Sequence, residues 1–427
     1  MSTGRRALVW LGQAVTMADD AALGRVVALL DGLKDRGAAD ELLARARHRL
    51  HGLRPPRPLA FTRLLFVPLD GVIVPASKWR RGEGQVPRSA LPALAAVVHA
   101  ALGTEGDVIA AACEGRLMAD AEAVERIGRG LWPAAARVLP AAAPPEWEAA
   151  GLAAADYPEI AALCRPVWAA GPALQAALAA GAGEASCERA LAALTAPANA
   201  GPDPFAAGLA TLMEAVPLPG QVAQVAAGVA PKFRAIAVRQ AEAALDRRGP
   251  EFDLLEPPAA AGTALALAVR LDDLEGCGLL DLSARRRLHA LRRGAEEACR
   301  ESFLASVERR VLAPLAALTD APEVADETVA AIETEARGLA RLEGAGRRLG
   351  DGGGAYDRAR RAIAGALALL AGRTRHPAGL RLMDLARVAE ILAGTEEAAA
   401  LLAGRRATAE AQPSPAGTPA GSLLPAR

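Results

Sequence analysis

The residues in this chain that could do chemistry are few and far apart. Two histidines, His48 and His51, stand three positions apart, which would place both on one face of a helix, as zinc ligands often are. No cysteine or acid lies near them to complete a zinc site, and the surrounding arginines would repel a cation. The other histidines also lack a nearby acid or nucleophile with a known spacing; they are His99, His289 and His376.

No catalytic or cofactor motif is present in the sequence. There is no G-x-S-x-G, no H-E-x-x-H and no kinase signature. We therefore expect no cofactor, no metal site and no catalytic residue, and we consider an enzyme less well supported than a binding protein. An enzyme with an unrecognised site stays as a third hypothesis, which a deep pocket lined by carboxylates or histidines would favour.

Four carboxylates fall close together in the second half of the chain and have two interpretations. They are Asp272, Asp273, Glu275 and Asp281. A metal site is one interpretation, but the spacing does not match a calcium-binding loop and no histidine accompanies it. Aspartates near helix ends more commonly accept hydrogen bonds from free backbone amides, so we expect helix capping and solvation here.

The most unusual stretch runs from Leu42 to Arg88 and is strongly basic. It has two acids, Asp70 and Glu83, against ten cationic residues, a net charge of +8 in a chain that is neutral overall. The cationic residues are Arg45, Arg47, Arg49, Arg54, Arg57, Arg63, Lys78, Arg80, Arg81 and Arg88. The remainder of the chain must then carry −8, and this asymmetry would steer anions towards the basic stretch.

Two interpretations of the basic stretch are open. In the structural one, its apolar residues fill a helical core and its arginines form a solvated rim. In the functional one, Trp79 supplies a flat contact surface and the neighbouring cations grip carboxylate or phosphate groups. The candidate partner-binding residues are then Lys78, Trp79, Arg80, Arg81, Arg88 and Arg63. The leading hypothesis is a non-enzymatic helical scaffold or adaptor that binds another macromolecule, and the expected partner is another protein. The alternative is a binder of an anionic surface, nucleic acid or acidic lipid, through Arg45–Arg88.

The elements around this stretch are predicted to be mostly helical. The chain is 52% hydrophobic but only 3% aromatic, because much of the apolar content is alanine and leucine, two strong helix formers. Two short apolar runs, Leu64–Val67 and Val72–Val74, flank Asp70-Gly71 and predict a β-hairpin. We therefore predict an all-α fold, an irregular multi-helix bundle or array with one short β-hairpin insert near residues 64–74.

Helical periodicity and proline placement divide the chain into five predicted regions. These are an N-terminal helical pair (1–53), the basic extended or hairpin insert (54–88), a short-helix domain (89–200), a long-helix domain (201–404) and a disordered tail (405–427). In the short-helix domain, Trp132, Trp147 and Trp168 are interpreted as packing anchors. In the long-helix domain, one helix from Ser283 to about Leu318 carries an apolar stripe that includes Cys299, Phe303 and Val307.

Cysteine usage and hydropathy bear on location. None of the five cysteines forms a C-x-x-C pair, which favours free thiols in a reducing compartment. The apolar run near the N-terminus follows Arg5 and Arg6 but lacks a clear cleavage site, and no window is long and apolar enough to span a membrane. We expect a cytoplasmic protein with no transmembrane segment.

Overall fold

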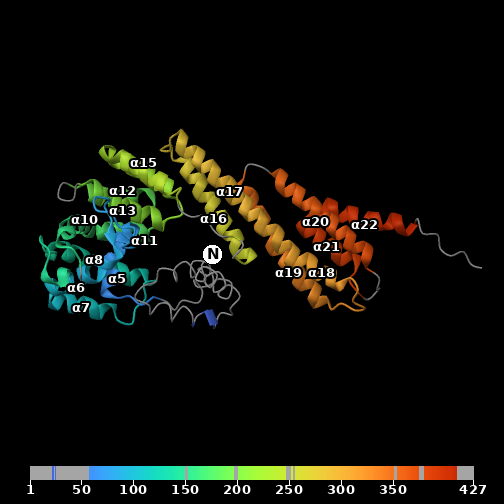
Figure 1. The fold of residues 1–427 in the computed structure, drawn as a ribbon, viewed down its shortest axis with the longest axis horizontal. Coiled ribbons are helices and arrows are strands. Elements are labelled where there is room, and N and C mark those ends of the chain that lie inside the picture. The colour runs from blue at the N-terminus through green and yellow to red at the C-terminus, as the bar shows by residue number, and fades with distance from the viewer. Residues whose placement is uncertain are drawn as a thin grey trace, which may run out of the picture. The chain divides into compact units, whose positions relative to one another are not determined.

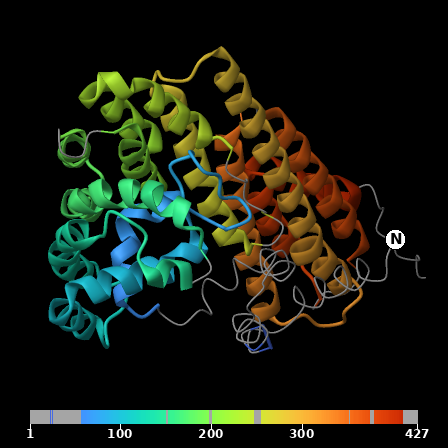
Figure 2. The same ribbon diagram turned by 60° about the vertical axis from the view of Figure 1, so that its left-hand side comes forward.

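The computed structural model describes most of the chain outside the N-terminus and the last residues. The described residues are 22, 23, 25, 57–149, 152–196, 201–246, 252, 255–350, 353–374 and 379–410. They form two compact units (Figures 1 and 2). Unit 1 comprises Met1–Gly249 with Ala266–Leu291, and unit 2 comprises Pro250–Leu265 with Arg292–Arg427. Helix α16 (Pro257–Gly276) and helix α17 (Leu282–Val307) each contribute residues to both units.

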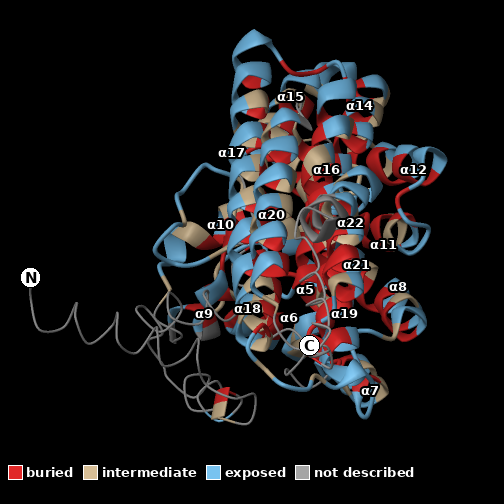
Figure 3. Ribbon diagram, turned by 90° about the vertical axis from the view of Figure 1, so that its right-hand side faces the viewer, coloured by how far each residue is buried: buried red, intermediate tan, exposed pale blue. Residues whose placement is uncertain are grey.

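Helices dominate both units, which confirms the predicted all-α fold with a small strand insert. The described strands are only β1 (Ile73–Val74) and β2 (Val86–Pro87), each two residues long. The alanine- and leucine-rich composition explains this result, because these side chains lose little entropy in a helix. Burial then separates the faces of each helix, and Figure 3 shows exposed positions gathered along one side of helices such as α17.

The predicted hairpin near residues 64–74 is wrong in its details. Phe61–Phe66 forms helix α5, and Val67–Val72 forms the 3-10 helix η1. Phe61, Leu64 and Leu65 are buried at helical spacing, so the apolar run reflects a buried helix and not a strand. The Asp-Gly pair lies inside η1. Strand β1 instead pairs in parallel with β2, with Ile73 opposite Val86 and Val74 opposite Pro87.

The rest of unit 1 is a set of short helices that pack around α5, η1 and one another. After β2 the elements are η2 (Arg88–Ala90), α6 (Leu91–Leu102), α7 (Thr104–Cys113), α8 (Ala121–Val138), α9 (Pro145–Ala149), η3 (Ala154–Asp156), α10 (Tyr157–Ala169), α11 (Gly171–Ala179), α12 (Glu184–Thr195), α13 (Pro202–Ala215), α14 (Pro219–Val229), η4 (Pro231–Phe233) and α15 (Arg234–Ala243). Helix α8 packs on α5, α6, α10 and α11, whereas α13 packs on η1, α10, α12, α14 and α15.

Unit 2 is built from longer helices. Helix α21 packs on α19, α20 and α22. The elements after α17 are the π-helical turn η6 (Glu308–Leu312), α18 (Ala313–Leu318), α19 (Asp326–Leu349), α20 (Gly353–Arg373), α21 (Leu382–Leu392) and α22 (Thr395–Glu410). The predicted stripe is confirmed, because Cys299, Phe303 and Val307 are all buried. The predicted long helix is interrupted by η6, after which α18 continues to Leu318.

Several predicted regions lie partly or wholly outside the described residues. The N-terminal helical pair falls almost entirely there, as do His48 and His51. Helix α22 runs to Glu410, so the first residues of the predicted tail are helical and the rest lie outside the description. The predicted five-region division stays a prediction. Among the described helices, none combines the length and apolar character needed to cross a lipid bilayer.

Candidate functional site

The candidate site is the segment between the two strands, residues 75–85, which we call the basic loop. Its ends are brought together by the pairing of β1 with β2. Inside it, the backbone amides of Lys78 and Trp79 both donate to the carbonyl of Pro75, at 2.9 and 3.2 Å. The Trp79 indole Nε1 donates across the loop to the carbonyl of Gln85, at 3.2 Å. The basic loop is therefore closed at its base and tied internally by a half-buried tryptophan.

Acidic side chains from two helices hold the outer part of the basic loop. The Arg81 guanidinium lies 2.6 Å from the Asp156 carboxylate and 4.0 Å from that of Glu159, at the start of α10. The backbone amide of Gly82 donates to Glu159 Oε1 at 2.6 Å. Gly84 has φ +61°, and a Cβ added there would lie 3.4 Å from the Asp203 Cβ at the start of α13. Side chains larger than glycine would strain this turn.

The predicted site residues in the basic loop fall into two groups. Arg81 is a fastening residue, because its guanidinium is already paired with carboxylates. Lys78 and Arg80 are exposed, and neither has a carboxylate partner among the described residues. The Arg80 guanidinium donates only to loop carbonyls, those of Ser77 at 3.3 Å and Trp79 at 2.8 Å. Lys78 and Arg80 are therefore exposed side chains of the loop, whereas Arg81 fastens the loop to Asp156 and Glu159.

The other predicted site residues lie outside the basic loop. Arg88 is exposed at the start of η2, directly after β2. Arg63 is exposed on α5, where its guanidinium donates to the carbonyl of Pro58 at 2.6 Å. No described contact joins Arg63 to the basic loop. The structure thus brings Arg88 to the base of the loop through the strand pairing and leaves Arg63 on a separate element.

The structure tests only part of the charge excess predicted from the sequence. Four of its arginines, Arg45, Arg47, Arg49 and Arg54, lie outside the described residues. Around the basic loop, acids from other elements offset the cations. The acids are Glu83 within the loop together with Asp156, Glu159 and Asp203 beside it. The described residues around the basic loop therefore carry both positive and negative charge, and they do not form a purely cationic face.

Trp132, Trp147 and Trp168 are fully buried in unit 1, which confirms their interpretation as packing anchors. The Trp132 indole donates to the carbonyl of Leu64 at 2.8 Å, and that of Trp168 donates to the carbonyl of Leu65 at 2.8 Å. Both carbonyls lie near the end of α5. Trp147 is also fully buried and donates to the carbonyl of Ala153 at 2.9 Å. Each buried indole N–H is therefore satisfied.

The 3-10 helix η1 is fixed to α13 by one threonine. The Thr211 hydroxyl accepts a hydrogen bond from the amide of Gly71 at 3.2 Å and donates to the carbonyl of Pro68 at 3.1 Å. A Cβ added to Gly71 would lie 2.4 Å from the Thr211 backbone nitrogen, closer than any real contact. Gly71 is therefore required because η1 lies directly against the backbone of α13.

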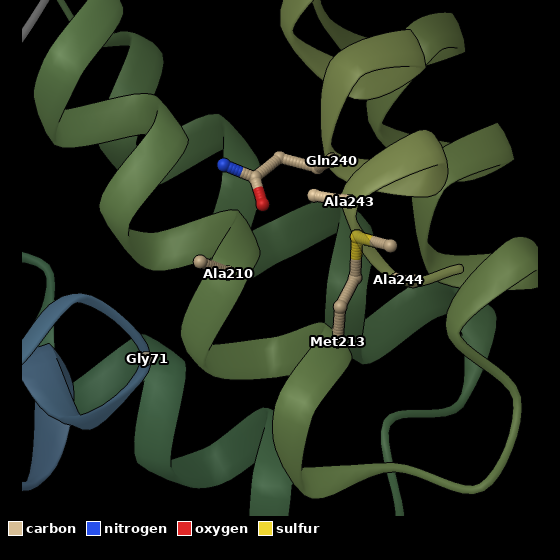
Figure 4. Close-up of a pocket in the computed structure, with 6 residues that line it drawn as sticks. All are labelled: Gly71, Ala210, Met213, Gln240, Ala243 and Ala244. Atoms are coloured by element: carbon tan, nitrogen blue, oxygen red, sulfur yellow. The ribbon is translucent and has the colours of Figure 1, made fainter. Parts of the chain in front are cut away.

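A small open pocket lies where η1, α13 and α15 meet (Figure 4). It has a volume of about 180 Å³ and is lined by Gly71, Ala210, Met213, Gln240, Ala243 and Ala244. Gln240 is the one lining residue with a polar side chain, and its amide extends over the space between α13 and α15 in Figure 4. No carboxylate or histidine lines it, so the pocket does not favour the enzyme hypothesis.

Two of the four clustered carboxylates, Asp273 and Asp281, cap helices, as predicted. Asp273 accepts hydrogen bonds from the amides of Gly220 and Gln221 at the start of α14, the second at 3.0 Å. Asp281 accepts from the amide of Ala284 at 2.7 Å at the start of α17. Within the described part of the chain, no group of three potential metal ligands is placed to hold an ion.

The cysteines are free and buried. Their residues are Cys113, Cys164, Cys187, Cys277 and Cys299. Burial raises the pKa of the Cys299 thiol to about 11, against the opposing effect of the neighbouring Tyr356 hydroxyl. Burial also raises the pKa of Cys113, Cys164 and Cys187. These thiols are packing groups and not activated nucleophiles.

Sequence reasoning missed the acids that hold the basic loop. Asp156 and Glu159 are visible in the sequence only as acids at a helix start, and Asp203 has the same appearance. The pairing of Asp156 and Glu159 with a loop more than seventy residues earlier is a tertiary contact. The residues next to a carboxylate at a helix start do not indicate which cation it will pair with in the folded chain.

No protein-family model matches this chain, and no curated protein or solved structure does either.

Proposed function

We propose that this chain is a non-enzymatic helical scaffold or adaptor that binds another protein, and that the basic loop is part of the contact surface. The observation that carries the proposal is the division of roles within the loop. Arg81 fastens the loop to α10, whereas Lys78 and Arg80 are held exposed without a carboxylate partner among the described residues. A loop already ordered before binding loses less conformational entropy when a partner arrives.

The mixed local charge favours a protein over a polyanion as the partner. Nucleic acids and acidic membranes present closely spaced negative charge, which would also meet Glu83, Asp156 and Glu159 beside the basic loop. Like charges brought together in this way oppose binding. A protein surface can place single carboxylates opposite Lys78 and Arg80 and avoid the loop's own acids. The five free thiols favour a cytoplasmic location for this function.

The experiment is affinity capture of partners with the full-length chain and with a charge-reversed loop. The loop variant is Lys78→Glu/Arg80→Glu. The matched control is Arg126→Glu/Arg137→Glu, which makes the same charge change at two exposed positions of α8. We expect a protein partner that the wild type and the control retain and the loop variant loses. A partner that all three chains bind equally would show that the basic loop is only structural.

Salt titration separates a protein partner from a polyanion. The affinity of a protein for duplex DNA falls steeply with salt, with a slope of roughly −0.9 per phosphate neutralised in a log–log plot. We expect binding of a protein partner to depend much less on salt, because few charges are neutralised. If purified chain instead binds a DNA duplex, or vesicles of acidic lipid, with a steep slope that the loop variant abolishes, the anionic-surface alternative replaces the proposal.

A further inference from the structure

The basic loop carries opposite charges on its two sides. The indole Nε1 of Trp79 donates across the loop to the carbonyl of Gln85, at 3.2 Å, so the two sides of the loop lie close together. Lys78 and Arg80 flank Trp79 on the first side, which we call the cationic arm. Glu83 lies on the second side, which we call the acidic arm. The loop therefore presents a positive and a negative surface next to each other.

Asp203, at the start of α13, adds a second carboxylate to the acidic arm. A Cβ added to Gly84 would lie 3.4 Å from the Asp203 Cβ, which places Asp203 beside the residue that follows Glu83. Glu83 and Asp203 are both exposed, and neither carboxylate has a partner among the described residues. Lys78 and Arg80 have no carboxylate partner there either. Two cations and two acids are thus left unpaired, and their formal charges cancel.

Contacts with α10 hold the two arms in place. The Arg81 guanidinium, which lies between the arms in the sequence, is paired with Asp156. The next backbone amide, that of Gly82, donates to Glu159 at 2.6 Å. The arrangement of charges is therefore formed before a partner arrives, which lowers the entropic cost of binding.

We propose that the basic loop binds the same loop of a second copy of this chain across a two-fold axis. In such a symmetric contact, every pair formed between two groups is formed twice, once in each direction. The cationic arm of each chain then meets the acidic arm of the other. Glu83 and Asp203 of the second copy supply the carboxylates that Lys78 and Arg80 lack within their own chain. This inference rests on the proposed function, because it specifies the protein that the loop recognises.

The charge pattern favours a second copy over other occupants. A polyanion or a uniformly acidic peptide would bring negative charge against the acidic arm, and a basic peptide would bring positive charge against the cationic arm. A partner that suits both arms carries both signs in the reverse order, and a second copy has this pattern by symmetry. The whole chain has a formal net charge of zero at pH 7, so long-range repulsion does not oppose the association of two copies.

The test measures the molecular mass of the full-length chain by sedimentation equilibrium over a range of concentrations. Lys78→Glu/Arg80→Glu reverses the cationic arm, and Glu83→Lys/Asp203→Lys reverses the acidic arm. We expect the wild type to form a dimer. Each loop variant alone should dimerise at least about tenfold more weakly, because every pair across the axis becomes a repulsion.

Mixing the two loop variants gives the sharpest result. One variant then carries negative charge on both arms and the other carries positive charge on both arms. An equal mixture should therefore form a heterodimer at least as stable as the wild-type dimer, although neither variant dimerises well alone. Misfolded chains would not recover binding in this way. The matched control is Arg126→Glu/Arg137→Glu on α8, which should dimerise as the wild type does.

Several results would overturn the inference. One is a wild-type chain that stays monomeric at about 100 μM, far above the dissociation constant of a micromolar dimer. A captured partner that still depends on Lys78 and Arg80 would leave the proposed function standing in that case. A dimer that neither loop variant weakens, or a mixture of the variants that stays monomeric, also overturns the inference. The absence of both self-association and any loop-dependent partner would overturn the proposed function as well.

Discussion

Replacing Gly71 by alanine tests how η1 is held against α13. The added Cβ would lie 2.4 Å from the backbone nitrogen of Thr211 and 2.6 Å from the carbonyl carbon of Ala210. Both atoms belong to the backbone of a helix, so neither can move aside as a flexible side chain would. The clash must be relieved by lifting η1 away from α13. The hydrogen bond from the Gly71 amide to the Thr211 hydroxyl is then lost or lengthened.

The expected cost combines two effects. Forcing an extra methyl group into a packed contact costs about 1–3 kcal/mol. Loss of the Gly71–Thr211 hydrogen bond adds about 1 kcal/mol. We therefore expect Gly71→Ala to lower the free energy of unfolding by roughly 2–4 kcal/mol.

The assay is urea unfolding of the full-length chain followed by tryptophan fluorescence. All five tryptophans lie in unit 1, so the signal reports the unit that contains Gly71. The matched control is Gly130→Ala in α8, where an added Cβ meets nothing within 4 Å. A helix-interior glycine replaced by alanine should gain about 0.5–1 kcal/mol. If Gly71→Ala unfolds at the same urea concentration as the wild type, the close approach of η1 and α13 is refuted.

Three further predictions concern other side chains of unit 1. Thr211→Val should lower the free energy of unfolding by about 1–3 kcal/mol, since it leaves η1 groups unpaired, and Thr211→Ser should recover most of the loss in urea unfolding. Asp273→Ala should lower the free energy of unfolding by about 1 kcal/mol, because it removes the cap of α14. A loss near zero in urea unfolding would mean that water replaces the carboxylate. Arg81→Ala should change the free energy of unfolding by less than about 1 kcal/mol, because its ion pair with Asp156 is exposed. The same substitution should speed trypsin cleavage after Lys78 or Arg80, because the loop loses its attachment to Asp156. Unchanged cleavage would contradict the fastening role of Arg81.

Thiol chemistry provides an independent check on the cores of both units. All five cysteines are buried, and burial raises the pKa of Cys299 to about 11. Since only the thiolate reacts quickly, we expect the native chain to react with an aromatic disulfide reagent far more slowly than the urea-unfolded chain. In the urea-unfolded chain all five thiols should react, which corresponds to five equivalents of the reagent's thiol released per chain. Raising the pH should speed the native reaction, because it populates the thiolate. Rapid reaction of even one thiol in the native chain would contradict the burial described here.

Much of the helical architecture could be predicted from the sequence, because it depends on local periodicity. The stripe through Cys299, Phe303 and Val307 recurs at helical steps, and these residues are buried as expected. Asp281 likewise caps a helix next to it in the chain. Such features involve neighbours a few residues apart, so composition and spacing are enough to predict them.

The segment that forms α5 and η1 shows where local reasoning fails. The run from Leu64 to Val67 fits a strand or a buried helix equally well by hydrophobicity alone, and the structure places helix α5 there. The Asp-Gly pair is typical of a hairpin turn, but Gly71 is needed for the close approach to α13. A glycine kept for close packing and one kept for a turn look the same in a sequence.

That the chain is helical, rich in alanine and unevenly charged follows from its residue types and their spacing. Which of its cations remain exposed without a carboxylate partner depends on the folded structure. Arg81 meets carboxylates from α10, whereas Lys78 and Arg80 do not. The physical reason is that an ion pair depends on the distance between two groups in space. Seventy-five residues separate Arg81 from Asp156 in the chain, and the fold alone brings them to 2.6 Å.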